Sequence, residues 1–145
     1  MNPRITVNEN ITLITLHNIP SEITYISDIF EDIAKLNVDV DMISMSPVQS
    51  DLTSLSFTIN DDDLTKLLEN SVFQKPIVSS GNRIISIFDS AMSGTPGFAA
   101  KVFKAASSAN ADIRIITTSE VQISILTTEA DYDETYKAIL HAFDE

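Results

Sequence analysis

An internal repeat is the feature of this sequence that most constrains its fold. When the sequence is shifted by 73 positions, residues 25–44 align with residues 98–117, and four of the aligned positions are identical. The identical pairs are Phe30 with Phe103, Asn37 with Asn110, Asp39 with Asp112, and Ile43 with Ile116. Because the order of the predicted elements repeats as well, we infer that the chain contains two copies of one structural unit.

Hydrophobic periodicity predicts the same series of elements in both copies. In the first copy, we expect strand, helix, strand, strand, helix and strand at residues 11–17, 21–36, 38–45, 52–59, 61–69 and 74–79. In the second copy, strand, helix, strand and strand fall at residues 83–88, 96–109, 112–117 and 120–126, and a helix ends the chain. A further short strand at residues 4–8 is expected to lead into a turn at residues 8–10. We expect a second turn at Gly81 and Asn82, before the second copy begins.

The helices show apolar stripes that predict their buried faces. The stripe of the first helix consists of Ile23, Ile26, Phe30, Ile33 and Ala34, and that of the last helix of Tyr132, Tyr136, Ile139, Leu140 and Phe143.

The series is typical of the ferredoxin-like βαββαβ unit, an α+β fold in which two helices cover one face of a four-stranded antiparallel sheet. The second copy lacks a last strand, and the surplus strand at the N-terminus is the candidate to take that place. We therefore expect two domains, residues 10–80 and residues 81–145, with residues 3–9 completing the sheet of the second. Separating the halves would then expose a sheet edge.

Composition excludes several classes of function. The chain has 21 acidic and 9 basic residues, a net charge of −12 that repels phosphate backbones and anionic lipid, so we expect neither nucleic acid nor a membrane as a partner. Cysteine is absent, and two histidines, His17 and His141, are too few for a histidine-built metal cluster. The sequence has no membrane-length apolar run and no phosphate-binding fingerprint, so we expect a cytoplasmic protein without cofactor or metal ion.

No grouping of serine, histidine and acid suggests a nucleophile, so we expect no catalytic residues. The segment Ser93–Gly97 instead predicts a helix start, with Thr95 as the cap and Pro96 in the first helical position. The free amides that follow would suit a ligand carboxylate. Taken alone, however, the segment is better explained as a simple helix start.

Several segments together are more distinctive. Residues 92–103 are MSGTPGFAAKVF and residues 111–124 are ADIRIITTSEVQIS, while residues 37–43 and 54–59 are NVDVDMI and SLSFTI. These resemble motifs of the tandem ACT regulatory region at the C-terminus of aspartokinases: a Met-x-Gly-x-Pro-Gly turn, an Ile-Ser-Thr-Ser-Glu-Ile strand pair, and the strands Ile-Asn-Val-Asp-Met-Ile and Ile-Ser-Phe-Thr-Val. The resemblance covers nearly the whole chain and implies two ACT domains without the kinase domain, so a regulatory module rather than an enzyme.

The resemblance also implies a ligand and partners. We expect a small amino-acid effector, lysine or threonine, a homodimer, and a catalytic kinase partner. An alternative is an assembly subunit of the ACT fold that binds no ligand. Two departures from the family pattern favour it slightly: Met45 stands where many relatives have a glutamine that contacts the effector, and residues 89–91, Asp-Ser-Ala, replace a Gly-x-Gly. A small ferredoxin-like enzyme is a further alternative.

The same resemblance implies the effector-binding residues. In the second copy they are Met92, Ser93, Gly94, Thr95, Pro96, Gly97, Asp112, Ile113, Ser119 and Glu120, and in the first copy Asn18, Ile19, Pro20, Ser21, Asp39, Val40 and Met45. The effector carboxylate would lie on a helix start, at residues 94–97 or 19–21. Its ammonium would lie near Asp112 or Asp39.

Overall fold

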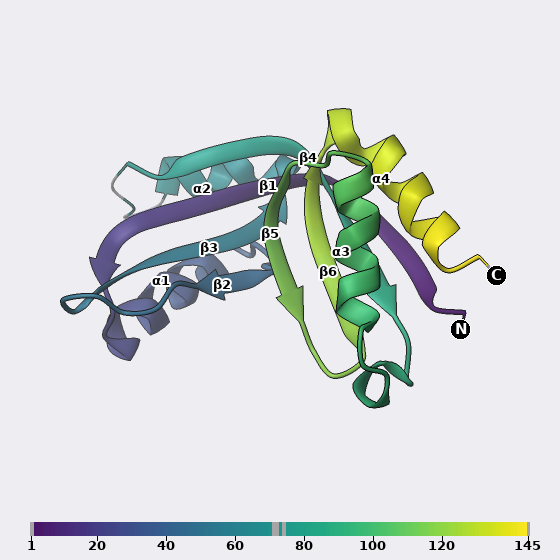
Figure 1. The fold of residues 1–145 in the computed structure, drawn as a ribbon. Coiled ribbons are helices and arrows are strands. Elements are labelled where there is room, and N and C mark those ends of the chain that lie inside the picture. Colours follow the sequence, from purple (N-terminus) through teal and green to yellow (C-terminus); the bar gives the residue numbers. More distant parts are fainter. Residues whose placement is uncertain (1, 71–72, 74, 145) are drawn as a thin grey trace. The chain divides into compact units, whose positions relative to one another are not determined.

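The computed structural model describes residues 2–70, 73 and 75–144, and the chain adopts the expected α+β fold (Figure 1). The strands are β1 (Arg4–Pro20), β2 (Ile43–Met45), β3 (Leu52–Asn60), β4 (Ile77–Phe88), β5 (Ile113–Thr118) and β6 (Gln122–Thr128). The helices are α1 (Ile23–Lys35), α2 (Leu64–Asn70), α3 (Phe98–Ser108) and α4 (Glu129–Ala142), and two 3₁₀ turns are η1 (Asp61–Asp63) and η2 (Met92–Gly94). Within the described residues, no helix has the length and apolar character needed to cross a membrane.

The chain divides into two compact units, residues 10–81 and residues 1–9 with 82–145. The hydrogen-bonded strand order is β2-β3-β1-β4-β6-β5, and β1 and β4 each run from one unit into the other. Each unit therefore contains four strands, β2-β3-β1-β4 in the first and β1-β4-β6-β5 in the second. The pairings of β3 with β1 and β2, and of β6 with β4 and β5, are antiparallel.

The turns expected at residues 8–10 and at Gly81 and Asn82 are both wrong. Strand β1 continues through the first position and strand β4 through the second. Asn10 and Gly81 have left-handed backbones, with φ of 61° and 72°, and both lie inside strands. A single left-handed residue can be accommodated in a strand as a bulge, whereas a tight hairpin needs a complete turn. The turn-forming residues here mark the points where each strand passes between units.

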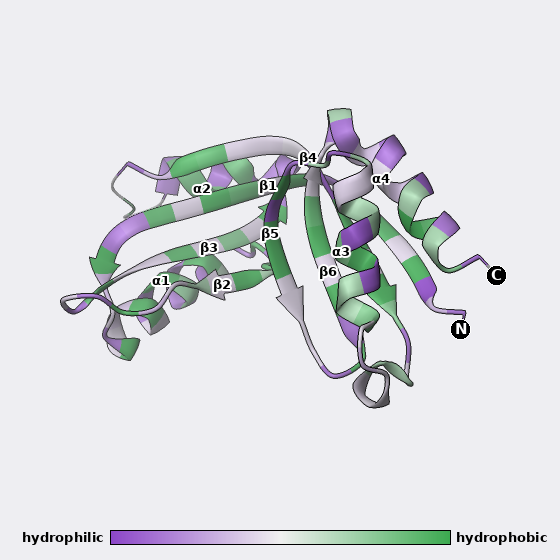
Figure 2. Ribbon diagram, viewed as in Figure 1, coloured by the Kyte–Doolittle hydropathy of each residue, from purple (hydrophilic) through white to green (hydrophobic). Residues whose placement is uncertain are grey.

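Each unit has its own apolar core on the helix-covered face of its sheet. In the first unit, Ile14 and Phe57 of the sheet pack with Ile33 of α1 and Leu67 of α2. The core of the second unit contains Ile85, Ile87, Ile123 and Ile125 of the sheet, Val102 of α3 and Ile139 of α4. Apolar and polar residues alternate along the strands (Figure 2), the pattern of sheets with one face packed against helices.

The predicted helix stripes are correct in the middle and wrong at their margins. The buried face of α1 is formed by Ile26, Ile29 and Ile33, and Ile23 is 77% exposed. Successive residues turn by about 100° around a helix, so Ile23 and Ala34 lie roughly 90–110° from the centre of this face. Leu140 is exposed on α4 for the same reason.

The strand expected at residues 38–45 is shorter than predicted. The Met42 N–H donates to the Thr58 side-chain Oγ1 at 2.9 Å, and the Asp41 N–H donates to the Thr58 carbonyl at 3.1 Å. A side-chain hydroxyl thus takes part in the pairing, and the regular ladder of β2 is confined to Ile43–Met45. At the next expected strand, Gln74 lies outside the described residues, and β4 begins at Ile77.

The N-terminal segment of β1 takes the place of the missing last strand in the second unit, as expected. The Arg4 guanidinium lies 5.1 Å from the centre of the Phe88 ring, and Ile5 packs against the core of this unit. A carboxylate oxygen of Glu9 lies 3.7 Å from the Arg83 guanidinium. Contacts at both ends of the segment therefore hold it to this unit.

Arg83 also binds α4 to the same segment of the sheet. Its guanidinium lies 4.4 Å from the centre of the Tyr132 ring, and one of its nitrogens is 3.6 Å from a Glu129 carboxylate oxygen. Partial burial, together with the nearby Tyr136, raises the pKa of Tyr132, while Arg83 acts in the opposite direction. Tyr132 therefore stays a neutral phenol at neutral pH.

A buried hydroxyl links the shared strands in the first unit. Thr12 Oγ1 donates to Asp61 Oδ1 at 2.6 Å and lies 2.9 Å from Ser80 Oγ. The Gly81 N–H also donates to Asp61 Oδ1, at 3.3 Å. One carboxylate at the start of η1 thus accepts hydrogen bonds from both β1 and β4.

We predict that deleting residues 2–9 selectively destabilises the second unit, because β4 then becomes an unpaired edge. Hydrogen–deuterium exchange should show faster exchange of amides in residues 83–88, while residues 55–59 of β3 keep their protection. Unchanged exchange in β4 would show that the N-terminal segment does not close this sheet.

Candidate functional site

The first candidate site is a hollow of about 330 Å³ in the second unit, here called the α3 hollow. It lies where η2 and the start of α3 meet the turn between β5 and β6. Its lining residues are Met92, Ser93, Thr95, Gly97, Phe98, Ala99, Thr118, Ser119, Glu120 and Ile123. Six of the residues expected from the second copy thus line one hollow, namely Met92, Ser93, Thr95, Gly97, Ser119 and Glu120, whereas Gly94 and Pro96 do not.

Backbone hydrogen bonds hold these two segments in place. The Asp89 N–H donates to the Val121 carbonyl at 2.9 Å, which joins the end of β4 to the β5–β6 turn. Within that turn, the Ser119 N–H donates to the Gln122 carbonyl at 2.8 Å. The Asp89 carboxylate accepts the Ala91 N–H at 2.8 Å. The rim of the hollow is therefore built from short, hydrogen-bonded turns.

The helix start differs from the prediction. Thr95 does not cap the helix, because its Oγ1 donates back to the Ala91 carbonyl at 2.7 Å. Gly97 occupies the capping position with a left-handed φ of 86°, and α3 begins at Phe98 rather than at Pro96. Among the described residues, the N–H groups of Ala99 and Ala100 have no backbone acceptor. They are the amides that a carboxylate could approach.

The floor of the α3 hollow is apolar and its rim is polar. Phe98 and Ile123 are buried, and Met92 is half-buried against the core. Ser93, Thr118 and Ser119 are exposed. Of the described lining residues, Glu120 alone carries a charge, and it is exposed as well. The hollow therefore presents hydroxyls and one carboxylate to a ligand.

Asp112 and Ile113 do not line this hollow. They precede and begin β5, whereas Thr118 ends it, a separation of about 16 Å at 3.3 Å per residue. The Asp112 carboxylate accepts from Arg114 Nε at 2.9 Å, and the Asp112 N–H donates to Asp131 Oδ2 at 2.9 Å. The structure thus does not bring Asp112 together with the start of α3 within one chain.

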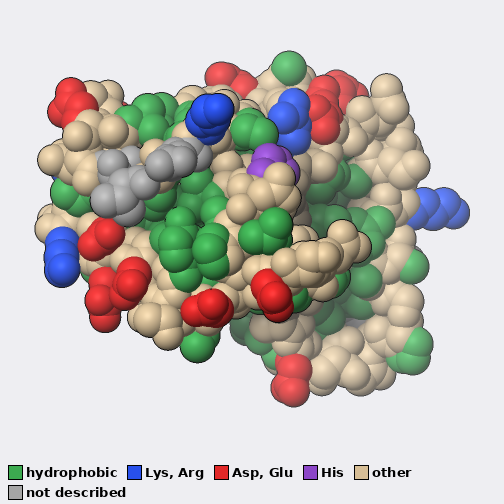
Figure 3. Space-filling model, turned by 90° about the vertical axis from the view of Figure 1, so that its left-hand side faces the viewer, with side chains coloured by type: hydrophobic (Ala, Val, Ile, Leu, Met, Phe, Trp, Pro, Cys, Tyr) green, Lys and Arg blue, Asp and Glu red, His purple; other side chains and the backbone are tan. Residues whose placement is uncertain are grey.

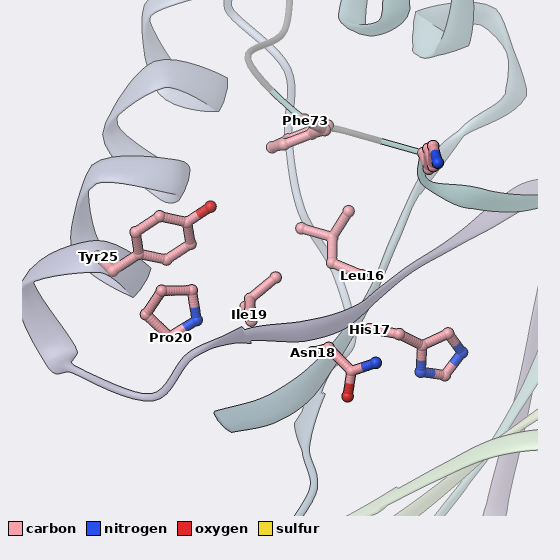
Figure 4. Close-up of a pocket in the computed structure, with 8 residues that line it drawn as sticks. Leu16, His17, Asn18, Ile19, Pro20, Tyr25 and Phe73 are labelled. Carbon is pink, nitrogen blue, oxygen red and sulfur yellow. The ribbon is translucent and has the colours of Figure 1, made fainter. Parts of the chain in front are cut away.

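A second hollow, of about 540 Å³, lies in the first unit at the end of β1, and we call it the β1-end hollow (Figure 4). It is lined by Leu16, His17, Asn18, Ile19, Pro20, Tyr25, Phe73 and Lys75. The pairing of β1 with β3 shifts between Leu16 and Ile19, and Asn18 there has a left-handed φ of 54°. Three of the seven residues expected from the first copy, Asn18, Ile19 and Pro20, are among its lining residues.

The other residues expected in the first copy lie outside this hollow. The Ser21 N–H donates to the Asp51 carbonyl at 3.0 Å, so it is engaged in holding the start of α1. Asp39 is exposed in the loop before β2, and Val40 packs against the core. Met45 is 49% exposed at the end of β2.

Sequence reasoning missed five lining residues of the β1-end hollow: Leu16, His17, Tyr25, Phe73 and Lys75. Tyr25 aligns with Phe98 in the repeat, which indicates its position but not a role. Phe73 and Lys75 are more than fifty residues from β1 in the sequence, and no local pattern relates them to it. His17 has a polar partner, since its Nδ1 lies 2.9 Å from Ser54 Oγ.

Comparison with known proteins identifies the family of the second unit. Residues 85–143 match the family model of the ACT domain. These residues form an ACT domain. They include the α3 hollow, β4 from Ile85 onward, and the whole of α3, β5, β6 and α4.

Along its length, the chain resembles the regulatory region of aspartate kinases. Over 97% of the chain, it is 30% identical to an aspartokinase of Bacillus sp. (strain MGA3). The structure of the regulatory subunit of aspartate kinase from Thermus flavus is similar, with a TM-score of 0.85, 26% identity and coverage of 97% of both chains. The aspartate kinase from Synechocystis is similar with a TM-score of 0.86 and 28% identity, over 96% of this chain and 26% of that chain.

The matching region is the regulatory part of these relatives. The chain spans only 36% of the length of the Bacillus aspartokinase. By contrast, it matches the Thermus flavus regulatory subunit end to end. The 145 residues thus correspond to about a third of the Bacillus aspartokinase and to nearly the whole of the Thermus flavus regulatory subunit.

We predict that Gly97→Ala lowers the free energy of unfolding by about 1–2 kcal/mol, because a Cβ is strained at this left-handed φ. Gly94→Ala is the matched control, since nothing lies within 4 Å of the position of its Cβ and its backbone is not left-handed. Urea denaturation of the two variants measures the difference. Equal stabilities would contradict this account of the helix start.

Proposed function

We propose that this chain is an amino-acid-binding regulatory module of the aspartate pathway, with lysine or threonine as its effector. Its support is the α3 hollow, whose lining includes hydroxyls, one carboxylate and the free amide of Ala99, within the residues that match the ACT domain model. The similarity to the Thermus flavus regulatory subunit supports the regulatory role. A regulatory subunit needs a catalytic partner, and we propose that an aspartate kinase chain fills this role.

The lining of the α3 hollow suits an α-amino acid. The amide of Ala99, at the positive end of the α3 dipole, would bind the carboxylate. Glu120 and the hydroxyls of Thr118 and Ser119 would bind an ammonium group, while Met92 and Ile123 contact the aliphatic stem. Lysine, with a second ammonium, would gain more from Glu120 than threonine would.

We further propose that the module acts as a homodimer and that its two units are two ACT domains, residues 10–80 and residues 81–145 completed by 3–9. The first unit exposes large apolar side chains, and Figure 3 shows apolar side chains on one face of that unit. The exposed large apolar side chains among the described residues of this unit are Ile23, Tyr25, Ile43, Met45, Val48, Leu52, Leu68 and Ile77. Exposed apolar surface of this kind often marks an interface. In a dimer, Asp112 or Asp39 of one copy could face a helix start of the other.

Binding would regulate the partner by favouring one arrangement of the dimer. A ligand shifts an equilibrium between two states only by the difference in its affinity for them. The effector would therefore have to bind more tightly in the arrangement that inhibits the kinase, and the kinase would in turn change the affinity for the effector. A cytoplasmic location follows from this proposal, because such a partner acts on cytoplasmic metabolites.

Calorimetric titration of the purified chain with lysine and with threonine tests the proposal. We expect saturable binding of at least one of them. At a hundred times its Kd, the ligand should add about 2.7 kcal/mol to the free energy of unfolding. If a folded dimer binds neither amino acid, the alternative of a ligand-free assembly subunit replaces this proposal; Met45 and Asp89–Ala91, which depart from the family pattern, favour that alternative.

We predict that Glu120→Gln weakens lysine binding about fivefold, the loss of roughly 1 kcal/mol expected for an exposed ion pair. Threonine binding should weaken less, since threonine has only its α-ammonium to pair with Glu120. Glu134→Gln on α4 is the control, because Glu134 is exposed and does not line the hollow. Lysine affinity that is the same in both variants would place lysine elsewhere.

A further inference from the structure

The two halves of β1 are buried to very different extents. In the half that belongs to the first unit, residues 11–14 and 16 are all buried. In the half that belongs to the second unit, residues 2–9, no side chain is buried, and exposed residues alternate with half-buried ones over residues 2–8. A strand segment that buries little apolar surface opens locally at a low free-energy cost. Residues 2–9, here called the N-terminal strand segment, are therefore the part of β1 that leaves its sheet most readily.

The contacts that join this segment to the second unit are partly exposed to solvent. Arg4, whose guanidinium lies 5.1 Å from the centre of the Phe88 ring, is itself exposed. The Glu9 side chain is 60% exposed at its 3.7 Å ion pair with Arg83. Ile5 packs against the apolar core but is only half-buried. Since exposed ion pairs and cation–π contacts contribute little to stability, these contacts determine where the segment lies more than they resist its release.

A hollow of about 500 Å³ lies beside the start of the segment, and we call it the terminal hollow. It is lined by Asn2, Pro3, Ile5, Leu140, His141, Phe143 and Asp144. Figure 1 shows the start of β1 beside the end of α4, the two elements that supply these residues. The side chains there leave this volume unfilled, so the start of the segment lacks the close packing that would hold it.

The segment is joined to the rest of β1 through an exposed connection with an unusual backbone. Asn8, Glu9 and Asn10 are exposed, and Asn10 has a left-handed φ of 61°. Asparagine adopts this conformation more easily than most residues do, but it is uncommon for any residue except glycine. Asn10 also lies at the border between the two compact units. The chain can therefore change direction at this residue without disturbing either core.

We infer that the N-terminal strand segment can leave its own second unit and complete the second unit of another copy of this chain. Its release opens the edge of β4, a row of backbone groups that pairs readily with another strand. A second copy carries the segment that is seen to fit there, with a cation for the Phe88 ring and a carboxylate for Arg83. Reciprocal exchange therefore remakes every contact of the segment between copies, and only the connection at Asn10 has to change.

The balance between the two arrangements depends on the path through Asn10. Within one copy, the segment competes for its site at an effective concentration of about 1 mM. At roughly 0.1 mM chain, exchange is therefore the minor arrangement in the wild type. Asn10→Pro favours exchange, because proline fixes φ at about −65° and excludes the left-handed backbone. Asn10→Gly is the matched control, since glycine adopts this backbone easily.

The chain has no cysteine, so two introduced cysteines can report exchange between full-length chains. One chain carries Asn2→Cys and the other Asp144→Cys, two positions that line the terminal hollow. The two chains are mixed and treated with a short bismaleimide. With Asn10→Pro in both chains, we expect the yield of the mixed cross-link to rise about tenfold over that of the Asn10 chains, whereas Asn10→Gly should leave it unchanged.

Two further variants distinguish exchange from any other association of copies. Ile5→Asp, added to the Asn2→Cys chain, should abolish the cross-link, because a carboxylate then replaces the side chain that packs against the core. Glu134→Cys replaces Asp144→Cys as the control position, since Glu134 is exposed on α4 and does not line the terminal hollow. A dimer formed through another surface would depend on neither Ile5 nor Asn10.

A mixed cross-link that increases with Asn10→Pro and is lost with Ile5→Asp supports the inference. A yield that stays at the level of the Glu134→Cys control, or that responds to neither substitution, overturns it. No amino acid enters this experiment, so its failure leaves the proposed function untouched.

A second measurement needs no substitution at Asn10. A synthetic peptide of residues 1–10 with Asn2→Cys is added in excess to the Asp144→Cys chain. We expect it to displace the chain's own segment and to form the cross-link, whereas the same peptide with Ile5→Asp should not. If neither peptide is cross-linked, or both are cross-linked equally, the inference is overturned even where Asn10→Pro fails to fold.

Discussion

Backbone pairing shared between the two units is the constraint on which the other elements depend. β1 and β4 each supply hydrogen bonds to both four-stranded arrays, and each changes unit at a residue with a left-handed backbone, Asn10 or Gly81. On the side of the first unit, hydrogen bonds of Thr12 with Asp61 and Ser80 connect the two strands. Arg83 and Glu9 fasten them on the other. The helices then cover the apolar faces that these strands define.

The same two strands place the two hollows. One hollow follows β4 and the other lies at the end of β1, so both occupy the position in the repeat where a strand leads into a helix. The backbone around each position is held by its own hydrogen bonds, such as Asp89 with Val121 and Ser21 with Asp51. The two copies thus have similar backbone arrangements at these positions, but the charged lining residue is Glu120 in one hollow and Lys75 in the other.

The fold could be predicted from the sequence further than the site could. Alternating apolar residues reveal strands because one face of each sheet is packed, and the repeat reveals the order of elements. The turns predicted at Asn10 and Gly81 are wrong, since a residue with a left-handed backbone can form a bulge within a strand as well as a turn. Thr95 looked like a cap, but its hydroxyl turned back to Ala91 and Gly97 took that position.

The lining of the hollows was only partly predictable for a different reason. The family resemblance named residues in segments 92–97 and 119–120, and most of these residues line one hollow. Phe73 and Lys75 come close to the end of β1 only in the folded chain, so no local sequence pattern predicts that they line this hollow. Asp112 was expected at a ligand and instead accepts a hydrogen bond from Arg114, a neighbour two residues away in the same strand. Local sequence shows which groups are available, and the fold decides their partners.

The exchange of strands between units also orders events during synthesis. Residues 4–9 are synthesised well before their partner in β4, which begins only near Arg83. At roughly 5–20 residues per second, the N-terminal segment waits about 4–15 seconds as an unpaired edge. Closing a loop of this length costs chain entropy that the first unit can reduce by folding before the second. Folding during synthesis therefore has a preferred order. The first unit folds before the second, and residues 4–9 stay unpaired until β4 has been synthesised.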